Sequence, residues 1–371
     1  MNKNTILEIA TIFILAIIMS TGIQTTGLFT ASQGTKNLTI NAILPLTGIN
    51  SMYGEAQKQG IELAIEEINN ENEETFSLNA NYEDNQSDPK VALSALQKIL
   101  TQNPKIIIST MTPTTTPLLP ALKDKNIILL IGGSISSSLA PQDKYFFKDH
   151  ADVTEWAGTL TNAVKEKQLT KTALVYFQTD QGEAFAKKVK TTVNPILIES
   201  FDPITNDFKT IVLKIKESGA DNIVFAGFPK NAGAILKSLE ETNVILPTFL
   251  INANWPEVTA NGVGNKIQPY TAGHEFDATI KTTQAKEFIA KFKAKYNKEP
   301  TVESAIIYDT VKLLGSKIKL CGNDNECIAK ELANTHDYIA TTGKINYAQN
   351  RNSARASILL QYKDGKWMQT N

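Results

Sequence analysis

Residues 37–70 read NLTINAILPLTGINSMYGEAQKQGIELAIEEINN, and this stretch decides the fold class. Residues 38–44 are mostly apolar, which is typical of a strand buried in a parallel sheet. Residues 55–69 follow a short loop and carry apolar side chains such as Ile61 and Ile65 at helical spacing. A buried strand that leads into an amphipathic helix is the first half of a βαβ unit and predicts an α/β protein.

The alternation of strand and helix continues along the chain in two similar series. The first series is predicted to contain strands at 38–44, 78–82, 106–109 and 127–131, and helices at 55–69, 89–100 and 117–123. The second is predicted to contain helices at 155–165, 183–191, 208–216 and 232–240, and strands at 172–177, 196–200, 222–225 and 248–251. Repeated units of this kind build a parallel sheet covered by helices on both faces, so we expect two Rossmann-like lobes.

The C-terminal part of the chain has a different pattern. We expect a strand at 270–276, helices at 284–296, 302–318 and from Ile328, and strands at 344–347 and 356–362. The turn at 363–366 contains an Asp-Gly pair, which is a strong hairpin signal. The chain is therefore expected to end in antiparallel strands.

The composition excludes some classes of protein. The chain has 371 residues, of which 42% are hydrophobic and 20% charged, and its formal net charge is -1. This length suits two lobes of ordinary domain size. Acidic and basic residues are interspersed along the chain, so no basic stripe is present and we expect no nucleic-acid partner.

Residues 1–36 differ from the rest of the chain. Lys3 precedes an apolar run at 9–19, and small and polar residues follow as far as Ser32. This order is typical of an export signal. One interpretation is a signal peptide cut near Ala31, and the other is an uncleaved N-terminal membrane anchor. Both interpretations place the folded part outside the cytoplasm.

The two cysteines, Cys321 and Cys327, frame a short polar loop. Two thiolates without a neighbouring histidine pair cannot complete a tetrahedral zinc shell, and a redox pair is usually spaced Cys-x-x-Cys. A structural disulfide between two helices fits the spacing and the exported location. We therefore expect this disulfide, no metal site and no cofactor.

Two hydroxyl-rich loops follow neighbouring strands. Residues 110–116 read TMTPTTT, and residues 132–138 read GGSISSS. In open α/β sheets, ligands collect outside the carboxyl ends of the strands. Hydroxyls and backbone N–H groups at a helix start can hold a carboxylate or another anion there. Helix capping is the alternative interpretation, but it needs only one or two such residues.

No catalytic set can be assembled from the sequence. It contains no Gly-x-Ser-x-Gly, Gly-x-Gly-x-x-Gly or Walker motif. The three histidines are His150, His274 and His336. His274 and Glu275 could pose as an acid–base pair, but adjacent strand residues point to opposite faces. We therefore expect a binding protein rather than an enzyme.

Several short segments carry a resemblance to a known family. They are residues 43–48 (ILPLTG), 53–54 (YG), 60–64 (GIELA), 82–89 (YEDNQSDP), 172–175 (TALV) and 308–311 (YDTV). In this order they resemble the periplasmic leucine/isoleucine/valine-binding protein family, which are the type 1 substrate-binding proteins of ABC importers. The likeness covers the chain after Lys36.

The resemblance implies two lobes joined by three crossing segments that act as a hinge. The crossings are expected near residues 151–152, 276–277 and 350–351. The expected first lobe comprises 37–152 and 276–350, and the expected second lobe comprises 153–275 and 351–371.

The resemblance also implies residues that hold the ligand. Family members bind an amino acid's carboxylate with first-lobe hydroxyls and amides, cover it with a tyrosine, and add an aromatic side chain from the second lobe. The matching residues are Thr112, Thr114, Ser134, Ser136, Tyr53 and Phe228.

Two stretches depart from the family pattern. The acidic residue that usually pairs with the ligand ammonium is replaced by the sequence Asn-Ala-Asn-Trp at 252–255, and a frequent Tyr-Gly is replaced by Gln181-Gly182. A buried ammonium without an anionic partner is costly. An α-amino acid ligand would therefore need a substitute acid, and otherwise the ligand is an amide, a small carboxylate or another neutral molecule. The candidate acids are Asp180, Asp202 and Glu275, and the further candidate ligand-binding residues are Gln181, Asn252 and Trp255.

Together these features predict an extracytoplasmic solute-binding protein. We expect it to capture a small polar ligand, either an amino acid or a related amide or carboxylate, and to deliver it to the permease subunits of an ABC importer. We expect a monomer. The alternative is a ligand-sensing receptor module of the same fold, and such receptors usually continue into a transmembrane helix and a signalling domain.

Overall fold

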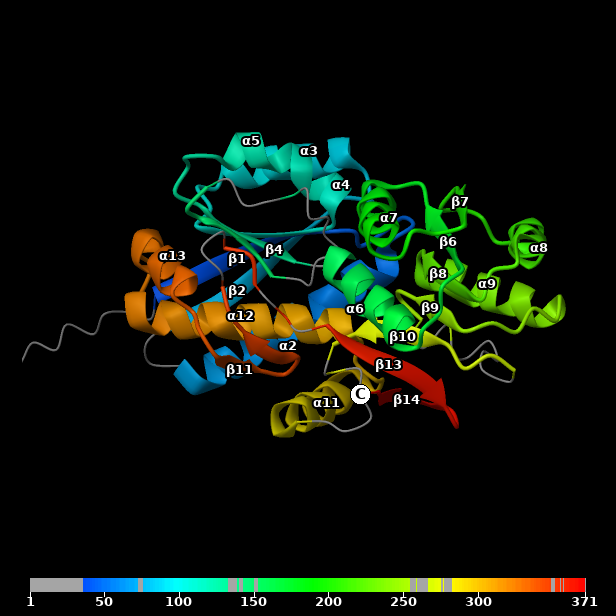
Figure 1. Ribbon diagram of the computed structural model, residues 1–371. Helices are drawn as coiled ribbons and strands as arrows, with labels where there is room; N and C mark the ends of the chain where they lie inside the picture. Colours follow the sequence, from blue (N-terminus) through cyan, green and yellow to red (C-terminus); the bar gives the residue numbers. More distant parts are fainter. Residues whose placement is uncertain are drawn as a thin grey trace, which may run out of the picture. The chain divides into compact units, whose positions relative to one another are not determined.

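The computed structural model describes residues 36–72, 76–132, 139, 143–149, 153–253, 258, 266–274, 276, 282–347, 351–353, 355 and 357–370. Within these ranges the chain forms two large open sheets with helices packed on them (Figure 1). We call the five-stranded sheet with its helices the first lobe, and the seven-stranded sheet with its helices the second lobe. The expected fold class, with two Rossmann-like lobes, is confirmed.

The first-lobe sheet is entirely parallel and has the strand order β2-β1-β3-β4-β5. Its strands are β1 (Lys36–Leu44), β2 (Phe76–Asp84), β3 (Ile106–Thr110), β4 (Ile128–Gly132) and β5 (Phe146–Lys148). Every residue of β3 and β4 is buried, because helices cover both faces of a parallel sheet.

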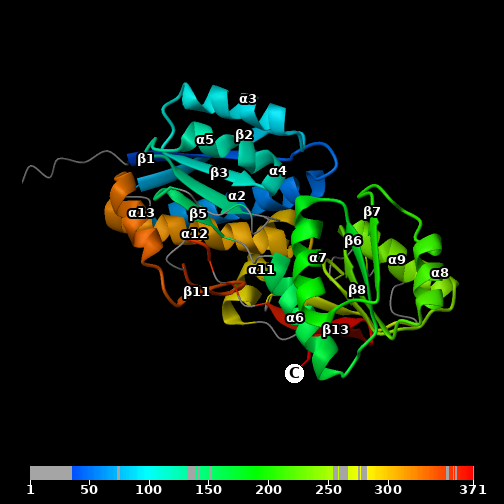
Figure 2. The same cartoon turned by 45° about the horizontal axis from the view of Figure 1, so that its top comes forward.

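The helices of the first lobe lie on both sides of this sheet. On one side are α3 (Pro89–Leu100), α4 (Thr112–Thr115), the 3-10 turn η1 (Thr116–Leu118) and α5 (Leu119–Leu122); on the other are α2 (Ser51–Asn72) and α12 (Val302–Cys321) (Figures 1 and 2). The lobe also contains α11 (Thr283–Tyr296), α13 (Asn325–Ala333) and the small hairpin of β11 (Tyr338–Ala340) and β12 (Gly343–Ile345). Helices α2 and α12 approach closely at Gly60, where a Cβ would lie 2.3 Å from the carbonyl oxygen of Ser304.

The second-lobe sheet has the strand order β14-β13-β10-β9-β8-β6-β7 and is parallel except at β13 and β14. Its strands are β6 (Thr172–Phe177), β7 (Leu197–Phe201), β8 (Asn222–Ala226), β9 (Thr248–Leu250), β10 (Tyr270–Gly273), β13 (Ile358–Lys363) and β14 (Lys366–Gln369). Its helices are α6 (Val153–Glu166), α7 (Asp180–Val193), α8 (Lys209–Ser218) and α9 (Pro229–Glu241). Asp364 and Gly365 both have positive φ angles, 50° and 76°, which confirms the predicted Asp-Gly hairpin.

The chain passes between the lobes three times. It leaves the first sheet after Lys148 and enters α6 at Val153, and it returns after β10, where Phe276 joins the core of the first lobe. The last passage runs from Tyr347 in the first core to β13 in the second sheet. The exact crossing points remain predictions, because residues 151–152, 277 and 350 lie outside the described part of the chain.

The helix predicted at 117–123 is wrong in extent, others such as those predicted at 55–69 and 183–191 are longer in the structure, and two short strands were not predicted. Helix 117–123 was expected, but helical structure begins at Thr112 and is divided among α4, η1 and α5. Within this helical stretch the hydroxyls of Thr114 and Thr116 bond to the carbonyl groups of Thr110 (2.7 Å) and Thr112 (2.8 Å), four residues before them. Strands β5 and β11 are only three residues long, too short for an alternating pattern to mark them.

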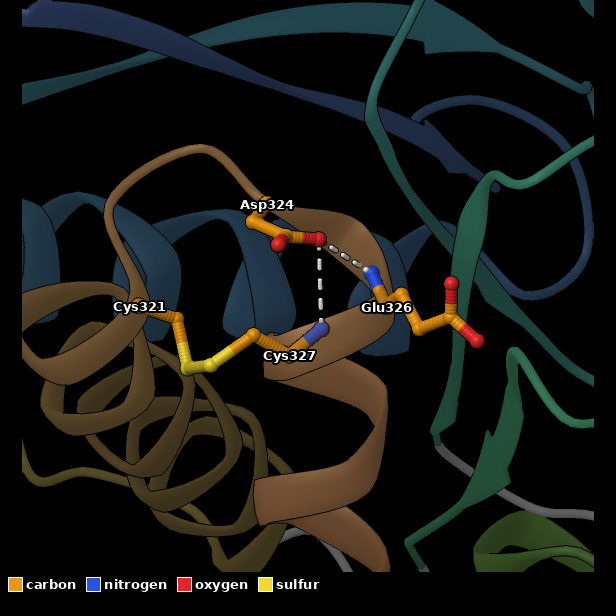
Figure 3. The surroundings of a disulfide bond; sticks show 4 residues. All are labelled: Cys321, Asp324, Glu326 and Cys327. Atoms are coloured by element: carbon orange, nitrogen blue, oxygen red, sulfur yellow. Dashed lines mark hydrogen bonds between the residues drawn. A yellow bond between two sulfur atoms is a disulfide. The ribbon is translucent and has the colours of Figure 1, made fainter.

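The predicted disulfide is present between Cys321 and Cys327 (Figure 3). It joins the end of α12 to the first turn of α13. Asp324 caps α13 by accepting hydrogen bonds from the backbone N–H groups of Glu326 (2.9 Å) and Cys327 (3.2 Å). Cap and disulfide together fix the start of α13. No helix among the described residues has the length and apolar character needed to span a bilayer.

Replacing both cysteines with serine is expected to lower the free energy of unfolding by about 2 kcal/mol, because the crosslink restricts a short loop of the unfolded chain. Urea unfolding of the oxidised protein and of the double variant measures the difference. A reducing agent should lower the stability of the wild type toward that of the variant and leave the variant unchanged. Equal stability of the two oxidised proteins would contradict this role.

Candidate ligand-binding site

The loop between β1 and α2 is held by the carboxylate of Asp84. This carboxylate accepts hydrogen bonds from the N–H groups of Leu46 (3.0 Å) and Thr47 (3.1 Å) and from the Thr47 hydroxyl (2.6 Å). Partial burial alone would raise the pKa of the Asp84 carboxyl group. The hydrogen bonds from Thr47, Gln86 and Leu46 outweigh this effect and lower the pKa below its ordinary value. The start of α2, and with it Tyr53, is therefore fixed to the neighbouring strand β2.

Two residues of the first lobe pack into the core of the second. Tyr53, in the first turn of α2, is only 4% exposed, and Met111, directly after β3, is 5% exposed. Both belong to the hydrophobic cluster that is otherwise formed by second-lobe residues. The carboxyl ends of β1 and β3 therefore face the second lobe, where a ligand site of an open α/β sheet is expected.

The threonine-rich stretch after β3 forms α4 rather than a loop. The Thr114 hydroxyl donates to the Thr110 carbonyl (2.7 Å), and the hydroxyls of Ser109 and Thr115 bond to each other (2.8 Å). These groups are engaged within the turn, so the Thr114 hydroxyl can accept a hydrogen bond from a ligand but cannot donate one. Thr112 is buried at the first position of α4. Ser134 and Ser136 lie outside the described residues.

Phe228 is held rigidly at the carboxyl end of β8. Its ring meets that of Phe177 edge to face, with 5.2 Å between the ring centroids. Its backbone N–H donates to the side-chain oxygen of Asn231 (3.0 Å), and the amide nitrogen of Asn231 donates to the Thr205 carbonyl (2.8 Å). The half-buried ring of Phe228 is thus a preformed apolar wall.

Asn252 and Gln181 lie at the ends of strands next to β8. Asn252 follows β9 in the left-handed region (φ 61°), and its amide nitrogen donates to the carbonyl of Gly227 (2.9 Å). Gln181 is half-buried in the first turn of α7, directly after β6. Because β9, β8 and β6 are neighbours in the sheet, the structure brings Asn252, Phe228 and Gln181 together at the carboxyl edge of the sheet, where these three strands end.

Asp180 and Asp202, the two candidate acids that the structure describes, do not form a buried anionic site. Asp180 and Asp202 are both exposed, and Asp202 accepts a hydrogen bond from the N–H of Ile204 (2.9 Å) in its own turn. Glu275 and Trp255 lie outside the described residues. Within the described ranges, no group of His, Cys, Asp and Glu side chains is arranged to hold a metal ion.

A ring pair at this edge was not predicted from the sequence. Trp156, in the first turn of α6, meets the ring of His274, at the end of β10, edge to face at 6.2 Å between centroids. Both side chains are buried. The helical spacing of α6 marks Trp156 only as a core residue, and nothing in the sequence indicates that α6 packs beside β10.

A separate groove lies between α2 and α11, far along α2 from Tyr53. It has a volume of about 580 Å³ and is lined mainly by charged side chains. These are largely paired with each other, as in Lys291–Glu67 (3.0 Å) and Lys295–Glu66 (2.5 Å). The described lining of this groove contains no aromatic side chain and no strand end, unlike the site around Tyr53 and Phe228.

Comparison with protein families gives one family model that spans nearly the whole folded part. The model described as "Periplasmic binding protein" matches residues 37–366. Among curated proteins, the chain is 24% identical over 355 residues to Leu/Ile/Val-binding protein homolog 3 of Brucella melitensis, covering 91% of this chain and 94% of that protein. It is 23% identical over 323 residues to the leucine-, isoleucine-, valine-, threonine- and alanine-binding protein of Pseudomonas aeruginosa, covering 82% and 83%.

Solved structures share the fold. The substrate-binding protein LivJ of Streptococcus pneumoniae, in complex with isoleucine, has a TM-score of 0.78 at 22% identity and covers 91% of this chain and 99% of its own. A solute-binding protein from Rhodopseudomonas palustris, in complex with benzoate, has a TM-score of 0.78 at 17% identity and covers 91% of this chain and 96% of its own.

Proposed function

Because the chain belongs to the periplasmic binding protein family, we propose that it captures a small polar solute between its two lobes and delivers it to the permease of an ABC importer. Members of this family are extracytoplasmic solute receptors. We further propose that the protein acts as a monomer without catalytic activity, and that residues 1–36 export it or anchor it to the membrane.

The packing of Tyr53 and Met111 against the second-lobe core carries this proposal. This packing supports a site between the carboxyl ends of the first-lobe strands and the strand ends that carry Phe228, Asn252 and Gln181. A solute bound there contacts both lobes, so its binding energy favours their closure. We propose that residues 37–152 with 276–350, and 153–275 with 351–371, move as the two lobes.

The ligand is proposed to be an amino acid or a related amide or carboxylate. Thr112 at the start of α4 supports a carboxylate group, with Ser134 and Ser136 as proposed partners. Phe228, Trp255 and Tyr53 are the proposed apolar walls, with Gln181 and Asn252 as polar contacts. Because Asp180 and Asp202 are exposed, an ammonium group would have to pair with Glu275.

A thermal-shift screen tests this proposal. Leucine, leucinamide and 4-methylpentanoate share one side chain but differ in carboxylate and ammonium groups, and benzoate adds an aromatic carboxylate. A solute at 100 times its dissociation constant stabilises the folded protein by about 2.7 kcal/mol. We expect at least one carboxylate of this size to raise the melting temperature. If no amino acid, amide or carboxylate does so, the proposed ligand class is wrong.

A further inference from the structure

A fully buried ionic cluster lies where two of the three passages between the lobes meet. The guanidinium of Arg355, on the last passage, donates from Nε and Nη2 to the two carboxylate oxygens of Asp149, on the first passage, at 2.9 and 2.8 Å. The exposed fraction of both side chains is at most 1%. This is a forked, two-bond ion pair, which fixes the relative orientation of its partners as well as their distance.

Further bonds hold the same two passages together. The hydroxyl of Ser353 donates to Asp149 (2.6 Å), the N–H of Lys148 donates to the carbonyl of Arg351 (3.0 Å), and the N–H of Ser353 donates to the carbonyl of Lys148 (2.8 Å). Lys148 and Asn352 accordingly form a parallel bridge. The first and last passages are therefore bonded side by side through both backbone and side chains.

The cluster is also bonded to the first lobe. Thr310 of α12 donates to Asp149 (2.5 Å), and Nη1 of Arg355 lies 3.4 Å from the carboxylate of Asp309, also on α12. Asp309 in turn accepts hydrogen bonds from the N–H groups of Thr341 (2.8 Å) and Thr342 (2.9 Å), between β11 and β12. The two passages are thus anchored to one helix and one turn of the first lobe.

We propose that Arg355 is a positioning residue for ligand capture, which joins the first and last passages into one pivot anchored on α12. The inference rests on the proposed function, because it assigns a role to the lobe movement that capture requires. Separate passages would allow the lobes to twist as well as open, whereas bonded passages leave mainly one bending movement. A restricted set of lobe orientations lowers the ordering cost of binding.

A buried ion pair often contributes no more stability than apolar side chains of similar size. Its directional bonds do fix geometry, and here they join segments that no sheet joins: Asp149 and Arg355 are 206 residues apart. The lone bridge between Lys148 and Asn352 is the only ladder contact between these passages within the described residues. Removing the side-chain bonds is therefore expected to loosen the pivot more than either lobe.

Spin-label distance measurements on the ligand-free protein test the proposal without knowledge of the ligand. Labels are attached through Lys123→Cys in the first lobe and Lys237→Cys in the second, both exposed positions. Arg355→Lys keeps the charge but loses the fork, and Ser353→Ala removes one hydroxyl bond. We expect both to broaden the distribution of distances between lobes relative to the wild type, with Arg355→Lys giving the larger effect.

A matched control separates positioning from general destabilisation. The control protein keeps both spin labels and carries Cys321→Ser and Cys327→Ser, which remove the disulfide at the far end of α12 and lower the stability there. It is expected to keep the wild-type distribution of distances between the lobes. If Arg355→Lys fails to fold, Ser353→Ala decides alone. Wild-type distributions in every folded cluster variant would overturn the proposal. A protein that binds no solute but shows the broadening would refute only the proposed function.

Discussion

Replacing Asp149 with alanine is expected to lower the free energy of unfolding by about 3–5 kcal/mol, because it leaves a buried guanidinium without its forked partner. Arg355 is only 3% exposed, so bulk solvent does not hydrate its guanidinium in the intact fold. Asp309 remains near Nη1 at 3.4 Å, which is long for a charge-assisted hydrogen bond. Urea unfolding with a two-state fit measures the loss.

An exposed ion pair provides the matched control for this substitution. Asp337 lies 3.0 Å from Lys344, and their side chains are 72% and 64% exposed. Asp337 itself has a φ of 51°, in which alanine would be strained, so the control is Lys344→Ala. This substitution removes the same ion pair and should change the stability by at most about 0.5 kcal/mol. An equal effect of the two alanine substitutions would contradict the structural role of the buried cluster.

The pH dependence of the Asp149 substitution has a defined sign. Burial alone would raise the pKa of Asp149, but the charge of Arg355 and hydrogen bonds from Arg355, Ser353 and Thr310 hold it below its ordinary value. A carboxyl group with a lowered pKa stabilises the fold above its unfolded value of about 3.9, and this contribution is lost as the pH falls through the folded value. The difference between wild type and Asp149→Ala should be full near neutral pH and shrink in acid.

Replacing Tyr53 with alanine is expected to weaken binding of the best solute from the screen by about 10- to 100-fold. The ring of Tyr53 is 4% exposed and packs among second-lobe residues. Its loss therefore removes a contact between the two lobes that forms only when they close on each other. Burial of an aromatic side chain is worth about 1.5–3 kcal/mol, which corresponds to this range of affinity. Titration calorimetry measures the affinity.

Tyr53→Phe is the control for the ring. It keeps the apolar wall and removes only the hydroxyl, so we expect a much smaller loss of affinity than for alanine. If Tyr53→Ala binds the solute as tightly as the wild type, Tyr53 does not cover the ligand. A loss that is equal in both variants would assign the effect to the hydroxyl instead.

Most of the fold could be predicted because its signals are local. The helix Pro89–Leu100 has the predicted bounds, since Asp88 caps it and accepts hydrogen bonds from Lys90 and Val91. The strand Thr172–Phe177 also has the predicted bounds, because a short run buried at every residue is a continuous apolar pattern. Such elements carry their own start and stop signals.

The features that were not predicted depend on contacts between distant segments. Nothing near Asp149 in the sequence indicates that Arg355 lies beside it. The threonines after β3 were interpreted as a ligand cradle, but hydroxyls such as that of Thr114 bond back within α4, and only the folded turn shows this. For the candidate site, the sequence and the family resemblance indicated Phe228 and Asn252, whereas the contact of Trp156 with His274 arises from packing of α6 beside β10.

A crystal structure of the protein with the best solute from the screen tests the central claim most directly. The account predicts one solute molecule between the lobes, with Tyr53 and Thr112 on one side and Phe228 on the other. A solute bound elsewhere, such as in the charged groove between α2 and α11, with no contact to either lobe's strand ends, would contradict it.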